Sequence, residues 1–176
     1  MKTTLISAAI LAAAASFAWA QFNSPPAQSS VEIGGKKLSV KYSAPSVHNR
    51  QIFGPGGVIS HDPTYPVWRA GANSATAFHT DADLDIGGLS VPKGDYTIFV
   101  NVGDPEHWEL IINKQIGQWG LAYNKAMDLG RVKMTMTKPP AKIETYKMTL
   151  SSTGGNTGKL QLEWDNSIAS VPITVK

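Results

Sequence analysis

Hydrophobic residues alternate with polar residues along most of the chain, with a period of two. The alternation is clearest over 38–42, 96–102, 108–112, 132–136 and 160–164. This period puts every second side chain on one face of a β-strand, so that one face is buried and the other is solvated. Further strands are expected over 31–33, 86–91, 143–151 and 168–175. Only Leu121–Asp128 could hold a turn or two of helix.

Turn signals separate these segments. They are Gly34-Gly35, Gly87-Gly88, Pro92-Lys93-Gly94-Asp95, Pro139-Pro140 and the Gly-rich stretch 153–158. Both Gly-Gly pairs follow an isoleucine, which indicates either a duplicated half or one type of hairpin used twice. About eight or nine short strands joined by such turns are typical of a sandwich. The sequence therefore predicts an all-β domain over 31–176, a single antiparallel β-sandwich that is jelly-roll-like or Ig-like.

The N-terminal segment has the pattern of a secretory signal. A positive start is followed by an apolar run over 5–15, and Ala18 and Ala20 occupy the small-residue positions of an A-x-A cleavage site. We expect a signal peptide over 1–20, cleaved after Ala20, and no membrane span in the mature chain. Residues 21–30 are rich in Pro, Ser and Gln and are expected to form a flexible leader.

Composition and charge narrow the expected cellular location and the expected partners. The chain has 176 residues, no cysteine and a net charge of +3, and its lysines are scattered. The missing cysteines exclude disulfides and thiol catalysis, and an exported chain without them suggests a bacterial periplasmic or secreted protein. No basic stripe could follow a phosphate backbone, so nucleic acid is not an expected partner.

Residues 44–75 break the alternation. The segment holds four prolines and four glycines, and a loop of this length in a compact domain is usually functional or disordered. Phe53, Tyr65 and Trp68 give it apolar surface to bury, so we expect one long ordered loop folded over a sheet. Candidate chemistry also gathers in this loop, including two histidines and two arginines.

Six short segments, taken in order, resemble a bacterial secreted family. They are Arg50-Gln51-Ile52-Phe53-Gly54, Val67-Trp68-Arg69-Ala70-Gly71-Ala72-Asn73, Pro92-Lys93-Gly94-Asp95-Tyr96, Trp108-Glu109-Leu110-Ile111-Ile112-Asn113, Gln118-Trp119-Gly120 and Leu162-Glu163-Trp164. The family is catalogued as domain of unknown function 2911. The resemblance covers about Val31 to Val175 and implies an exported, β-rich domain with no assigned reaction. Where the family typically has Glu after Gly-Ala-Asn, this chain has Ser74.

Seven side chains are the candidates for contact with a ligand. They are Arg50, Trp68, Arg69, Asn73, Asn113, Trp119 and Tyr123. Arginine offers fixed donors to anions or carbonyls, tryptophan offers a stacking plane, and asparagine and tyrosine can orient a polar group. A structural role is the open alternative for these residues. The tryptophans then pin the loop to the core, Arg69 pairs with Asp62 or caps loop carbonyls, and Asn73 holds a left-handed turn.

The sequence gives only weak indications of a metal site or a catalytic nucleophile. The candidate metal ligands are His48, His61, His79 and His107. None is spaced for a metal site on one element, and neither H-E-x-x-H nor G-x-S-x-G is present. We therefore assign no metal, cofactor or catalytic residue. Asp81, Asp83 and Asp85 have the spacing of one strand face, which is either a solvated edge or a site for a hard cation such as calcium.

These patterns favour an exported, non-catalytic domain that binds a small polar or sugar-like ligand, or an envelope protein, through the 44–75 loop. One alternative is a hydrolase or isomerase that uses His48 or His61 as a base, with Arg69 holding an anion. Another is a purely structural envelope domain.

Overall fold

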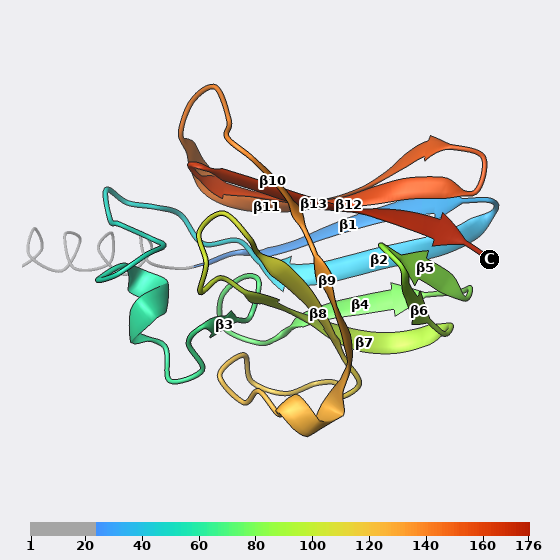
Figure 1. The fold of residues 1–176 in the computed structure, drawn as a ribbon, viewed down its shortest axis with the longest axis horizontal. Helices are drawn as coiled ribbons and strands as arrows, with labels where there is room; N and C mark the ends of the chain where they lie inside the picture. The colour runs from blue at the N-terminus through green and yellow to red at the C-terminus, as the bar shows by residue number, and fades with distance from the viewer. Residues whose placement is uncertain (1–23) are drawn as a thin grey trace, which may run out of the picture.

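Two antiparallel sheets face each other as a sandwich, and the long loop lies at one end of it (Figure 1). This computed structural model describes residues 24–176. The predicted signal peptide over 1–20 and its cleavage after Ala20 lie outside the described residues. No helix within 24–176 is long and apolar enough to cross a membrane.

The larger sheet has seven strands, in the order β1-β2-β4-β7-β8-β9 with β3 beside β7. Their bounds are β1 (Pro26–Ile33), β2 (Lys36–Ser43), β3 (Val67–Trp68), β4 (Thr76–Thr80), β7 (Gly94–Asn101), β8 (Glu109–Asn113) and β9 (Asp128–Lys133). Two short 3-10 helices lie in loops, η1 (Val58–His61) and η2 (Lys125–Met127). The second helix falls within the segment predicted to hold a helical turn.

The smaller sheet has six strands, in the order β11-β12-β13-β5-β6 with β10 beside β13. Their bounds are β5 (Leu84–Ile86), β6 (Leu89–Val91), β10 (Thr135–Thr137), β11 (Ile143–Gly154), β12 (Thr157–Asp165) and β13 (Ser167–Val175). The predicted all-β sandwich is confirmed, with thirteen strands within residues 24–176 in place of eight or nine.

Strand β4 shows why some strands were missed. Its inward positions include Thr76 and Thr80, which are polar but buried, so the hydrophobic alternation is absent. Each hydroxyl is satisfied inside the protein, Thr76 by donating to Ala70 O at 2.8 Å and Thr80 by donating to Ala82 O at 2.8 Å. Burial of threonine is tolerated because these hydrogen bonds replace those to water.

The predicted flexible leader over 21–30 is wrong for residues 26–30. They form the first part of β1 and pair with β2, from Pro26 opposite Ser43 to Ser30 opposite Ser39. The segment lacks large apolar residues, but alternate side chains are half-buried against β11. Ser29 shows the basis of this contact, because its hydroxyl accepts a hydrogen bond from Leu150 N at 3.0 Å.

Both Gly-Gly pairs form tight hairpin turns with positive φ at each glycine. The φ angles are 58° and 72° at Gly34 and Gly35, and 56° and 94° at Gly87 and Gly88. Positive φ at both central residues matches the right-handed twist of the flanking strands, and glycine adopts it without strain. The same local solution thus joins β1 to β2 and β5 to β6.

The 44–75 loop is ordered, as predicted, and contributes to the core. Val47, Ile52, Ile59 and Trp68 are all buried in the main cluster between the sheets. Trp68 stacks on Trp164 of β12 with ring centroids 5.7 Å apart, and Phe53 packs edge-on against both rings. The loop therefore closes one end of the sandwich with aromatic side chains.

Candidate functional site

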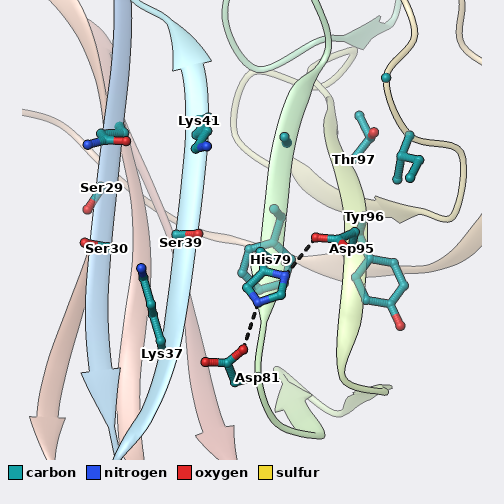
Figure 2. A pocket seen from close by; sticks show the side chains of 15 residues that line it. Ser29, Ser30, Lys37, Ser39, Lys41, His79, Asp81, Asp95, Tyr96 and Thr97 are labelled. Carbon is teal, nitrogen blue, oxygen red and sulfur yellow. Dashed lines mark hydrogen bonds and ion pairs between the residues drawn. The ribbon is translucent and has the colours of Figure 1, made fainter.

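A concave surface lies on the outer face of the larger sheet (Figure 2). A hollow of about 780 Å³ spans β1, β2, β4 and β7. A second hollow of about 330 Å³ adjoins it and shares Lys41, Ala77 and Gly117 with it. We refer to the two together as the groove. Its position differs from the prediction, which placed the ligand on the 44–75 loop.

Strand register aligns the groove side chains in two rows. Ser30, Ser39, His79 and Asp95 are successive cross-strand partners from β1 to β7. In the next row of the same face, the partners are Gln28, Lys41, Ala77 and Thr97. The two neighbours of Ser39 on β2, Leu38 and Val40, point inward and are fully buried. Because side chains alternate along a strand, the buried face fixes which polar groups reach the groove.

His79 lies at the centre of the groove between two carboxylates. Its Nδ1 donates to Asp95 Oδ1 at 2.8 Å and its Nε2 donates to Asp81 Oδ1 at 2.9 Å (Figure 2). Carboxylates only accept, so both bonds form together in the protonated imidazolium. The hydrogen bonds to Asp81 and Asp95 raise the pKa of His79, and the bond from His79 lowers the pKa of Asp81. The ring therefore acts as a cation that joins two acids rather than as a free base.

The His79 contacts predict a pH-dependent contribution to stability. The raised pKa means that the contribution is complete below about 6.5, the usual histidine value, and is lost as the pH rises through the folded-state pKa. The contribution to stability is also lost at low pH, once the Asp81 carboxylate is protonated and no longer pairs with His79. The lowered pKa of Asp81 moves this loss to lower pH. Solvent screening keeps the effect small, because 41% of the His79 side chain is exposed.

Two measurements check this expectation. An NMR titration of the His79 ring should give a pKa above 6.5. The stability difference between the wild type and His79→Gln should be larger at pH values below that pKa than above it. A ring that titrates at or below the usual value, or a difference that grows with rising pH, would contradict the assignment.

A segment that we call the strap, residues 114–127, forms one wall of the groove. Ile116 and Gly117 line the larger hollow, and Gly117 and Gln118 line the smaller one. Thr97 on β7 fixes the strap by donating from Oγ1 to Gln115 O at 2.6 Å. Backbone hydrogen bonds join it to the end of the 44–75 loop, from Ala75 N to Gln118 O at 3.2 Å and from Gly120 N to Asn73 O at 3.0 Å.

Two of the predicted ligand residues have structural roles in the loop. Arg50 donates from Nε to Val47 O at 3.0 Å and from Nη2 to Ser46 O at 2.8 Å, and thereby caps loop carbonyls. Trp68 is fully buried and donates from Nε1 to Gly71 O at 3.0 Å. These contacts match the structural alternative for both residues.

Three more of the predicted residues come together where the strap meets the loop. Arg69 forms an ion pair with Asp62 at 3.5 Å, and each of these side chains is 16% exposed. Gly120 packs so closely on Arg69 that an added Cβ would clash with its side chain. Asn73 adopts a φ of 60°, the left-handed turn of the structural alternative. Trp119 pairs with Ser74 and keeps 55% of its surface exposed, so it is the most accessible aromatic ring of the predicted set.

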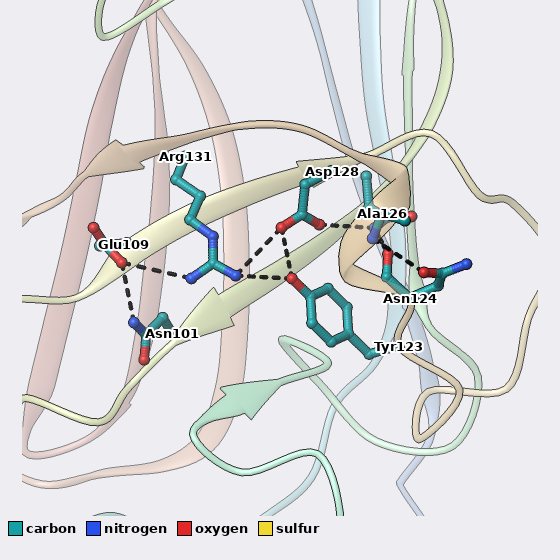
Figure 3. Close-up of polar contacts among 8 residues, drawn as sticks. Asn101, Glu109, Tyr123, Asn124, Ala126, Asp128 and Arg131 are labelled. Carbon is teal, nitrogen blue, oxygen red and sulfur yellow. Dashed lines mark hydrogen bonds and ion pairs between the residues drawn. The ribbon is translucent and has the colours of Figure 1, made fainter.

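The last two predicted residues, Asn113 and Tyr123, both bind Asp128, and Figure 3 shows the Tyr123 contact. Asn113 is fully buried and donates from Nδ2 to Asp128 Oδ1 at 2.8 Å, while Tyr123 donates from its hydroxyl to Asp128 Oδ2 at 2.6 Å. Arg131 donates to the Tyr123 hydroxyl at 2.8 Å and approaches Glu109 at 3.8 Å. Burial, followed by the hydrogen bond to Asp128, raises the pKa of Tyr123 to about 12. This cluster clamps the strap over β7, β8 and β9.

The other three histidines that were considered as metal ligands do not assemble into one site. The ring of His61 donates from Nδ1 to Gly57 O at 2.9 Å and His107 hydrogen-bonds to Asp104 at 2.9 Å, whereas the backbone of His48 donates to Glu144 at 2.8 Å. Within 24–176 no group of three or more His, Cys, Asp or Glu side chains is arranged to hold a metal ion.

The expectation of three aspartates on one strand face is wrong. Only Asp85 lies in β5, because the chain turns over residues 81–82 before that strand begins. Asp81 binds His79, Asp83 accepts from Lys93 N at 2.8 Å, and Asp85 accepts from Gly88 N at 2.7 Å. Each carboxylate thus serves a separate local contact.

Sequence reasoning missed the residues at the centre of the groove. They are Ser30, Lys37, Ser39, Lys41 and Asp95, and His79 had been weighed only as a metal ligand. The sequence feature that could have indicated these residues is the polar face of the alternating segment 38–42, where Ser39 and Lys41 are two residues apart. Their alignment with β4 and β7 depends on strand order, which alternation does not encode.

Comparison with known proteins identifies a family for this chain but no individual similar protein. No curated protein and no solved structure matches the chain. A family model, described as a protein of unknown function (DUF2911), matches residues 24–173 and therefore covers the whole sandwich except its last residues. The resemblance carried by the six sequence segments is confirmed, and the chain belongs to the DUF2911 family.

Proposed function

We propose that the protein is an exported, non-catalytic binding domain, and that the groove takes a polar ligand. The observation that carries this proposal is the groove itself, an open hollow of about 780 Å³ with a second beside it, lined by ammonium, hydroxyl and carboxylate groups. Concave surfaces with a few convergent polar groups are the usual binding sites of proteins.

The 44–75 loop supports binding less well than the groove does. Most of its predicted ligand groups already have internal partners, including the donors of Arg50, the indole of Trp68 and the charge of Arg69. A ligand would have to displace these contacts, whereas the groove needs no such rearrangement. The proposal therefore keeps the predicted class of ligand and moves its site.

The hydrolase or isomerase alternative gains no specific observation. His61 is hydrogen-bonded to a backbone carbonyl, and Arg69, the proposed anion holder, is paired with Asp62. The histidine that lies in the groove, His79, is held between two carboxylates. Because each ring nitrogen already faces a carboxylate, neither is placed to take a proton from a bound substrate.

Filling the groove should abolish binding without unfolding the protein. Ala77 is exposed at the centre of the face and borders both hollows, so Ala77→Trp would occupy the space from a solvent-facing position. A ligand at about 100 times its Kd adds roughly 2.7 kcal/mol, which raises the unfolding midpoint by about 5–10 °C. We expect this shift in the wild type with a sugar or organic anion, and no shift in Ala77→Trp.

Thr149→Trp is the matched control, because Thr149 is exposed on the outer face of the smaller sheet. It should keep the ligand-induced shift. Arg69→Ala separates the two candidate sites. Loss of the shift in Arg69→Ala, with the shift intact in Ala77→Trp, would place the ligand on the loop and contradict the proposal.

A further inference from the structure

We infer that the ligand of the groove is a linear glycan that carries carboxylate groups and lies along β2. The inference rests on the proposed function and specifies the ligand class. It starts from the length of the groove, which borders β2 from Lys37 to Ser43 without interruption, because the two hollows share Lys41. At about 3.3 Å per residue this distance is roughly 20 Å, which suits a chain of several sugar units better than one small molecule.

The charges of the groove favour an anionic chain. Lys37 and Lys41 are exposed on the same face of β2, four residues and therefore about 13 Å apart. Within 24–176 neither ammonium group lies in an ion pair with a carboxylate. The two acids of the groove, Asp81 and Asp95, share the single positive charge of His79 and so keep one net negative charge between them. With Lys37 and Lys41 the lining of the larger hollow carries a net charge of +1, and the two cations that lie outside any ion pair are spaced along β2.

The remaining polar groups of the groove match sugar hydroxyls. Asp81 and Asp95 bind His79 through Oδ1 only, and their side chains are 51% and 65% exposed, so each keeps an accessible oxygen acceptor. Ser30 and Ser39 add hydroxyl groups from the neighbouring strands (Figure 2). Acceptors and hydroxyl donors side by side can satisfy the vicinal hydroxyls of a sugar ring.

A peptide ligand fits this surface less well. Strands β2, β4 and β7 are hydrogen-bonded on both sides, so over these three strands the face presents side chains and no free backbone groups for strand addition. The side chains that β2 turns toward the groove are Lys37, Ser39 and Lys41, which favours recognition through charge and hydroxyl contacts.

An exposed aromatic ring lies near one end of the groove. Trp119 is 55% exposed and pairs with Ser74, which lines the smaller hollow. A sugar ring has apolar C–H faces, and an exposed indole offers them a flat surface. Trp119 is therefore the member of the predicted ligand set that we retain for the glycan site.

Calorimetric titration of the purified protein with acidic oligosaccharides tests the inference. The probes are oligomers of galacturonate, mannuronate and hyaluronan, with methyl-esterified oligogalacturonate as the uncharged counterpart of the same chain. We expect one or more acidic chains to bind. We expect the Kd to rise about tenfold or more on esterification, and by a similar factor in the double variant Lys37→Gln/Lys41→Gln. Added salt should weaken binding in the wild type.

Lys138→Gln/Lys147→Gln is the control for the loss of two positive charges, because both lysines are exposed and lie outside the groove. It should leave the Kd unchanged. If the esterified chain bound as tightly as the acidic chain, and only Ala77→Trp abolished binding, the inference of an acidic ligand would be wrong. The proposed function, binding in the groove, would still stand. Acidic binding that Ala77→Trp does not affect, or no binding of any charged or neutral chain, would overturn both.

Discussion

Trp68→Ala is expected to lower the free energy of unfolding by about 3–5 kcal/mol, the range for the loss of a large buried aromatic side chain. Trp68 is fully buried, stacks on Trp164 with centroids 5.7 Å apart and contacts Tyr146 at 5.1 Å. Its indole N–H also donates to Gly71 O at 3.0 Å, so the turn that leads into β4 loses a partner. The unfolding midpoint should fall by about 10 °C or more.

Trp119→Ala is the matched control for this experiment. Trp119 has the same side chain but is 55% exposed, and exposed substitutions usually change stability by less than about 0.5 kcal/mol. Urea unfolding of both variants distinguishes a tryptophan that packs in the core from one that is free to contact a ligand. Equal destabilisation by the two substitutions would mean that Trp68 does not anchor the loop in the core.

Asn113→Ala is expected to destabilise the protein by about 2–3 kcal/mol, because it leaves buried polar groups without partners. Asn113 is fully buried and donates to Asn124 O at 2.9 Å and Asp128 Oδ1 at 2.8 Å, and it accepts from Gln115 N at 3.0 Å. These bonds hold both ends of the strap. Hydrogen exchange of the strap amides should therefore accelerate more than that of the smaller sheet.

Asn124→Ala is the control within the same segment. Asn124 is exposed, and its side chain accepts only from Ala126 N at 3.0 Å at the start of η2. The loss of such a cap is expected to change the free energy of unfolding by about 1 kcal/mol or less for a helix this short. A larger effect for Asn124→Ala than for Asn113→Ala would contradict the role assigned to the buried amide.

The fold was predictable where one face of each strand is plainly apolar. The alternation over 96–102 and 160–164 became β7 and β12, and the Gly-Gly pairs became hairpin turns. Prediction failed where small or polar residues occupy inward positions. The serine-rich start of β1 and the buried threonines of β4 carry no hydrophobic period, yet hydrogen bonds make their burial acceptable.

The candidate site was harder to predict because its groups come from four strands. The sequence places Lys37 and Lys41 on one face of a strand, but it does not show that His79 and Asp95 lie beside them. The sequence analysis placed the ligand on the 44–75 loop because this loop contains arginine, histidine and tryptophan residues. These side chains also form internal contacts, and a loop without regular backbone pairing needs such contacts to stay ordered.

Amide chemical-shift mapping with an acidic oligosaccharide that binds is the most direct test of the central claim, that the ligand lies on the face of the larger sheet. We expect the perturbed residues to lie on β1, β2, β4 and β7 and over 116–118, with Lys37, Lys41 and His79 among them. The perturbations should disappear in Ala77→Trp and persist in Thr149→Trp. Perturbations confined to the 44–75 loop would contradict the claim and return the site to Arg69 and its neighbours.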